Sequence, residues 1–96
     1  MKYSPVKNFI AGNFIDVVGS RKMDVISPLD GTKLSELPMS SYKDLDDAVE
    51  AAKKAFPAWS RMPIKERVQV FFRYKTLLEK NMKELAELCS EENGKT

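Results

Sequence analysis

The apolar face of residues 63–80 constrains the fold of this chain more than any other feature of its sequence. Pro63 suits the first position of a helix, because proline has no backbone N–H to leave unpaired there. The apolar residues that follow recur at helical spacing and form one stripe: Ile64, Val68, Phe71, Phe72 and Leu78, widened by Val70, Tyr74 and Leu77. A helix with so wide an apolar surface needs cover on more than one side.

A second helix is predicted before this stripe. Ser41 is a suitable N-cap with Asp44 in the first turn, and apolar residues then recur at helical spacing as far as Phe56. Pro57 is predicted to stop this helix near Phe56, because the residue before a proline disfavours helical backbone angles.

A third helix is predicted to begin at Asn81 and to end at Asn93–Gly94, because glycine readily adopts the left-handed conformation of a helix C-cap. The run Gly94–Lys95–Thr96 is part of a phosphate-binding loop motif, but that motif requires another glycine where this chain has Cys89. A helix end followed by a lysine is therefore the favoured interpretation.

The first forty residues differ from the rest, with short apolar runs, glycines, prolines and no helical period. A β-hairpin is predicted over residues 8–15, with glycine supplying a positive φ angle at the turn Ala11–Gly12–Asn13. Residues 24–26 and 34–37 flank a second turn, which contains Pro28 and the pair Asp30–Gly31. The sequence thus predicts an α+β arrangement: two hairpin-like strand pairs at about 8–37, then three helices at about 42–93.

These elements cannot cover one another well. Two hairpins of short strands stabilise themselves poorly, and the three helices present a wide apolar surface. With 96 residues, the chain has at most one domain. We therefore expect residues 1–96 to be one part of a larger protein.

Composition excludes several classes of function. A content of 43% hydrophobic and 31% charged residues is ordinary for a globular protein, and the net charge is only +2. The basic residues of 61–75, Arg67 among them, surround a helix and are interrupted by Glu66, so we interpret them as a solvated rim and expect no nucleic-acid binding. No apolar run suggests a membrane span or a signal peptide.

Catalytic residues are scarce in this chain. It contains no histidine, which excludes His-based zinc sites and Ser-His or Cys-His catalysis. Its one cysteine, Cys89, cannot form an internal disulfide, so a reducing cytoplasm is expected. Because acidic residues surround Cys89 in a helix, we interpret it as a small packed side chain rather than a nucleophile. The pair Glu91–Glu92 is anomalous, since a carboxylate is unfavourable at a helix C-terminus.

Four motifs occur in one order along the chain: Asn8–Phe14, Val25–Gly31, Asp46–Trp59 and Glu92–Lys95. In this order and spacing they resemble the opening of the aldehyde dehydrogenase superfamily, with its "fINGeW", "v.NPatG", "da.AvaaA..Afp.W" and "E.GK" patterns. The first two motifs depart from the common pattern by substitutions that are conservative for a turn. Within the superfamily, residues 73–78 and 92–96 look most like methylmalonate-semialdehyde dehydrogenases.

The resemblance implies an enzyme that oxidises malonate or methylmalonate semialdehyde with NAD and releases a CoA thioester. It also implies that residues 1–96 are a truncated N-terminal portion of the cofactor-binding domain, without catalytic or cofactor-binding residues of their own. The expected partners are the rest of the same polypeptide and further copies in a homo-oligomer, and the isolated fragment is expected to self-associate or to be partly disordered. The alternative is a free-standing small α+β module that binds a partner protein.

The same resemblance suggests a metal site. In several aldehyde dehydrogenases, a monovalent cation is bound by backbone carbonyls before the Asn-Pro turn and by an acidic residue before the "NGK" cap. The matching positions here are Val25, Ile26 and Glu92. Such a site would apply to the full-length protein, and the alternative is a Glu92 that is solvated or paired with Lys95.

Overall fold

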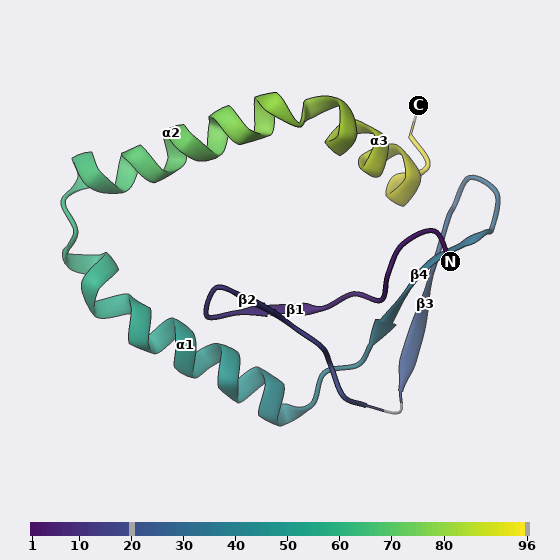
Figure 1. Cartoon of the computed structure of the whole chain (residues 1–96), viewed down its shortest axis with the longest axis horizontal. Helices are drawn as coiled ribbons and strands as arrows, with labels where there is room; N and C mark the ends of the chain where they lie inside the picture. Colours follow the sequence, from purple (N-terminus) through teal and green to yellow (C-terminus); the bar gives the residue numbers. More distant parts are fainter. Residues whose placement is uncertain (20, 96) are drawn as a thin grey trace.

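The computed structural model describes residues 1–19 and 21–95, which form four strands followed by three helices. The elements are β1 (Asn8–Ile10), β2 (Asn13–Ile15), β3 (Lys22–Ile26), β4 (Lys33–Pro38), α1 (Tyr42–Arg61), α2 (Ile64–Lys80) and α3 (Met82–Asn93). The three helices follow one another around an open ring, and α3 returns to the N-terminus (Figure 1). The β1–β2 hairpin lies inside this ring against α1. The predicted α+β order is therefore confirmed.

The first hairpin is held by a turn with two positive φ angles. Strands β1 and β2 are antiparallel, and Phe9 lies opposite Phe14 with ring centroids 4.9 Å apart. Ala11 has φ 51° and Gly12 has φ 81°, the combination that suits the twist of a two-residue hairpin turn. A positive φ was predicted for glycine alone, but Ala11 adopts one as well.

The second strand pair holds the core of the described residues. Strands β3 and β4 are antiparallel, with a register shift between Val25 and Ile26. The N-terminal segment also bonds to β4, since Tyr3 N–H donates to Leu34 O at 2.8 Å and Val6 N–H donates to Glu36 O at 2.9 Å. Leu34, 4% exposed, is the one buried hydrophobic side chain among the residues described.

Helix α1 begins as predicted but does not end as predicted. Ser41 and Asp44 form a capping box, in which each side chain accepts a hydrogen bond from the other residue's backbone N–H. Pro57 lies inside the helix, which continues to Arg61, so the predicted stop near Phe56 is wrong. The proline removes a single helical hydrogen bond, the one to the carbonyl of the exposed residue Lys53, and this loss does not end the helix.

The ends of α2 and α3 follow the predicted positions within a residue. Pro63 precedes the first residue of α2. Asn81 separates α2 from α3, but its side-chain amide donates to Leu77 O at 2.8 Å instead of capping α3. Gly94 ends α3 with φ 68°, as predicted, and its N–H donates to Ser90 O at 2.8 Å. Thr96, the last residue of the rejected phosphate-loop motif, lies outside the described residues.

The described chain is flat and open. Its radius of gyration is 17.1 Å, whereas a compact domain of this length has about 12.5 Å, and its extents are 47 × 35 × 16 Å. The predicted stripe on α2 is uncovered, with Ile64 69% and Phe71 61% exposed. Across residues 1–19 and 21–95, no helix combines the length and apolar character needed to span a bilayer.

Candidate functional site

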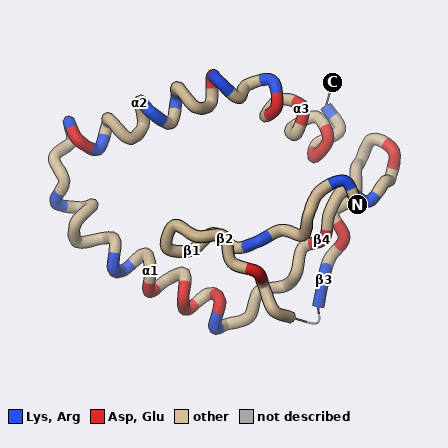
Figure 2. Tube along the Cα trace, viewed as in Figure 1, with Lys and Arg blue, Asp and Glu red and all other residues tan. Residues whose placement is uncertain are grey.

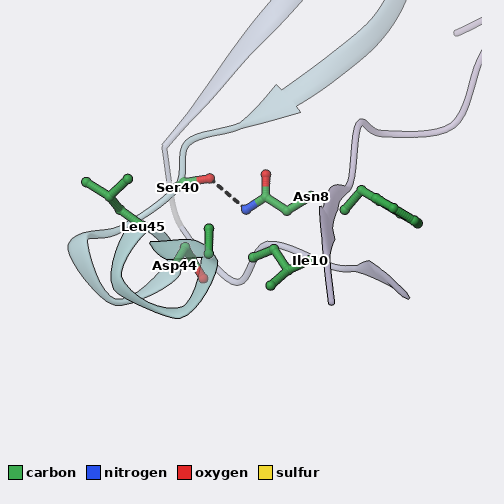
Figure 3. A pocket seen from close by; sticks show the side chains of 7 residues that line it. Asn8, Ile10, Ser40, Asp44 and Leu45 are labelled. Carbon is green, nitrogen blue, oxygen red and sulfur yellow. Dashed lines mark hydrogen bonds between the residues drawn. The ribbon is translucent and has the colours of Figure 1, made fainter. Parts of the chain in front are cut away.

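A shallow pocket of about 240 Å³ lies between the first hairpin and the start of α1 (Figure 3). It is lined by Asn8, Phe9, Ile10, Ser40, Asp44, Leu45 and Ala48. Asn8 Nδ2 donates to Ser40 Oγ at 2.9 Å, which ties β1 to the segment before α1. The Asp44 carboxylate accepts the Ser41 N–H at 2.7 Å, and this bond lowers the pKa of Asp44. The Asp44 carboxylate thus acts as part of the helix cap. The residues around the pocket hold the hairpin against α1, and none of them is placed as a general base or a nucleophile.

The predicted cation residues lie at neighbouring ends of β3 and α3. Val25 is half-buried and Ile26 is 49% exposed at the register shift of β3, and Glu92 is exposed in the last turn of α3. The two ends are close to each other: Gly94 directly follows α3, Pro28 comes two residues after β3, and a Cβ atom placed on Gly94 would lie 3.4 Å from Pro28 Cγ. Among the described residues, no three His, Cys, Asp or Glu side chains cluster as metal ligands. A cation here would therefore depend on backbone carbonyls, and the site stays a prediction for the full-length protein.

Glu91, not Glu92, makes the polar contacts at the end of α3. It accepts a hydrogen bond from Tyr3 Oη at 2.6 Å and forms an ion pair with Lys2. The hydrogen bond from Lys2, and then that from Tyr3, lower the pKa of Glu91. A cation beside the negative end of the helix accounts for a carboxylate at that position. No sequence pattern predicted this cluster, because Tyr3 and Glu91 are 88 positions apart.

Cys89 is exposed in this structure. The prediction that it is a small packed side chain is therefore wrong for the described chain. The physical reason is that the contacts of α3 with α2 and with the N-terminal segment leave the thiol uncovered.

A groove of about 310 Å³ lies where α1 meets α2, lined by Trp59, Ile64, Arg67, Val68 and Phe71. The last four residues have the spacing i, i+3, i+4 and i+7 and so share one face of α2. Arg67 is half-buried, and its Nε atom is buried without a hydrogen-bond partner. The interpretation of Arg67 as part of a solvated rim is therefore wrong, because Arg67 lies on the apolar face itself.

The surface charges do not form one basic patch. Acidic residues lie close together near the start of α1, and residues of both signs occur along α2 and α3 (Figure 2). The expectation that the basic residues of 61–75 bind no nucleic acid stays a prediction.

Comparison with known sequences gives a family. The pattern of the aldehyde dehydrogenase family matches residues 14–96. Malonate-semialdehyde dehydrogenase 1 of Geobacillus kaustophilus (strain HTA426) is 40% identical over 90 residues, which is 94% of this chain and 18% of the relative. Malonate-semialdehyde dehydrogenase of Bacillus pumilus (strain SAFR-032) is 41% identical over 91 residues, 95% of this chain and 19% of the relative.

Solved structures agree with the sequences. An NAD-dependent benzaldehyde dehydrogenase from Corynebacterium glutamicum matches with a TM-score of 0.88 and 34% identity. The match covers 95% of this chain and 20% of the chain of the benzaldehyde dehydrogenase. A protein from Sinorhizobium meliloti 1021, described as a methylmalonate-semialdehyde dehydrogenase complexed with NAD, has a TM-score of 0.85 and 34% identity over 95% and 18% of the two chains. This chain thus spans about a fifth of the length of these proteins. Its sequence and its fold place it in the aldehyde dehydrogenase family.

Proposed function

We propose that residues 1–96 are the N-terminal portion of the cofactor-binding domain of a longer NAD-dependent dehydrogenase, which oxidises malonate or methylmalonate semialdehyde to an acyl-CoA. The observation that carries this proposal is the 40% identity, along 94% of the chain, to a malonate-semialdehyde dehydrogenase. The exposed face of α2 supports the same view, because its apolar side chains need cover that the described residues do not supply.

The proposed reaction joins an aldehyde, NAD⁺ and the thiol of coenzyme A to give a thioester, NADH and a proton. NAD supplies the hydride acceptor when bound. Similarity to an NAD-dependent enzyme and to a protein complexed with NAD supports this cofactor, and the resemblance of residues 73–78 and 92–96 to the acylating subfamily supports CoA.

The part assigned to this segment is structural. The described residues offer no group suited to a nucleophile or a general base in the pocket between β1 and α1. We infer that the segment braces the cofactor domain of its own polypeptide, and that the full-length protein is a cytoplasmic homo-oligomer. The lone Cys89, which cannot form an internal disulfide, is consistent with that compartment.

Activity of the full-length protein tests the proposed reaction. The purified protein should reduce NAD in the presence of malonate semialdehyde, and mass spectrometry should detect an acyl-CoA when CoA is added. Benzaldehyde is the matched comparison substrate, since one structural neighbour acts on it. Faster NAD reduction with benzaldehyde than with either semialdehyde would reject the proposed substrate, and a free acid formed at the same rate with and without CoA would reject the acyl acceptor.

A further inference from the structure

The groove between α1 and α2 combines apolar walls with one unpaired cationic group. Trp59 contributes from α1, and Ile64, Val68 and Phe71 contribute from α2. Trp59 and Val68 are 38% and 37% exposed, while Ile64 and Phe71 are more than half exposed. The surface is thus a groove with an apolar rim, and the Arg67 side chain lies within it.

The Arg67 guanidinium lacks a partner that its surroundings require. Its Nε–H group is buried and donates to no acceptor, and no ion pair joins Arg67 to another of the described residues. An N–H that is removed from water without an acceptor is unfavourable, and more so when the group is charged. Whatever covers the groove would remove the remaining guanidinium N–H groups from water as well, so it must supply an acceptor for them.

The chemistry of the groove defines that covering group. An apolar occupant would bury Ile64 and Phe71 but would leave the guanidinium charge in an apolar site, which is unfavourable without a counter-charge. A carboxylate supplies both the charge and two oxygens that match the planar fork of an arginine. The occupant should therefore carry apolar side chains and one Asp or Glu.

The comparisons indicate where this occupant comes from, and the inference rests on the proposed function. The same backbone arrangement occurs as a fifth of one longer chain in the Corynebacterium structure, with a TM-score of 0.88. About four-fifths of such a polypeptide lies outside the segment described here and is available to cover it. A segment of the same molecule also has a higher effective concentration at the groove than a second copy.

We propose that the α1–α2 groove binds a segment of the same polypeptide from beyond residue 96, which packs apolar side chains against Trp59 and Phe71 and presents a carboxylate to Arg67.

The test uses the full-length protein and a zero-length crosslink. In the variant Arg67→Lys, a carbodiimide can join the new amine to a carboxylate in direct contact, and peptide mass spectrometry then identifies both partners. Arg73→Lys is the matched control, because Arg73 lies on the same helix but is exposed. Mixing normal and ¹⁵N-labelled protein separates links within one molecule from links between two.

We expect R67K to link to an Asp or Glu beyond residue 96 in the same molecule, with a yield several-fold above that of R73K at that carboxylate. Three results would overturn the proposal: links only to residues within 1–95, links that join normal to labelled molecules, or no link at all. A reading frame that ends at Thr96 would overturn it as well.

A measurement on the unsubstituted protein covers the case in which R67K does not fold. A dicarbonyl reagent that modifies arginine should react several-fold more slowly with Arg67 than with Arg73 in the full-length protein, and equal rates would contradict the proposal. Neither assay needs an aldehyde or NAD. A protein that forms the crosslink but does not oxidise a semialdehyde would refute the proposed function alone, and an active enzyme without the crosslink would refute the groove proposal alone.

Discussion

Replacing Pro57 by alanine should stabilise the C-terminal part of α1. Alanine restores the N–H that Pro57 cannot donate to the Lys53 carbonyl, and it removes the clash between that carbonyl and the proline ring. Proline is about 3 kcal/mol less favourable than alanine inside a helix. That value applies to a helix interior, whereas Pro57 lies four residues before the last residue of α1, so we take a smaller value. We therefore expect a gain of about 2 kcal/mol, or roughly a 30-fold smaller opening equilibrium.

Amide hydrogen exchange measures this gain directly. In P57A, the amides of Ala58 to Arg61 should exchange roughly 30-fold more slowly than in the original chain. Pro63→Ala is the matched control, because Pro63 precedes α2 and interrupts no helical hydrogen bond, so little change is expected there. Exchange in P57A within twofold of the original would refute the reasoning, because it would mean that α1 is not continuous through Pro57 in solution.

Four further predictions concern other parts of the chain. Ser41→Ala should destabilise α1 by about 1 kcal/mol in thermal unfolding, because the N-cap acceptor is lost. Since Lys2 and Tyr3 lower the pKa of Glu91 from its ordinary 4.5, their contact should be complete above pH 4.5 and should weaken as the pH falls through the lowered pKa. An NMR titration of the Tyr3 ring should show this acid transition, and E91Q should abolish it. Purified residues 1–96 should neither bind NAD in calorimetry nor oxidise an aldehyde, and turnover that survives controls for contaminating enzyme would contradict this. The same fragment should self-associate in sedimentation experiments, and Phe71→Ser should reduce the association if the exposed face of α2 drives it.

Local features of the sequence were predicted well because their causes are local. The capping box of Ser41 and Asp44, the turn at Gly12 and the C-cap at Gly94 each depend on a few consecutive residues. Pro57 was predicted wrongly for a related reason. Its local effect favours a helix end, but the loss of one helical hydrogen bond, at the exposed residue Lys53, does not end the helix.

Features that depend on distant contacts were not accessible in this way. No local pattern pairs Lys2 and Tyr3 with Glu91 at the far end of the chain. The position of Arg67 between Ile64 and Val68 on one helix face could have indicated that its side chain lies on the apolar face. A basic residue at such a position is, however, equally typical of the edge of an amphipathic helix. The packing of Cys89 was predicted wrongly, because that prediction assumed that another part of the chain packs over the thiol, and no described residue does so.

The hydrogen bonds from the N-terminal segment to β4 have a consequence for solubility. An unpaired strand edge is a template on which other chains can add strands and aggregate. Strand β4 pairs with β3 on one side and accepts the N–H groups of Tyr3 and Val6 on the other, so both of its edges are occupied. The first six residues thus protect the most buried strand of the chain from intermolecular pairing, and a protein that begins at Lys7 would expose that edge to other copies.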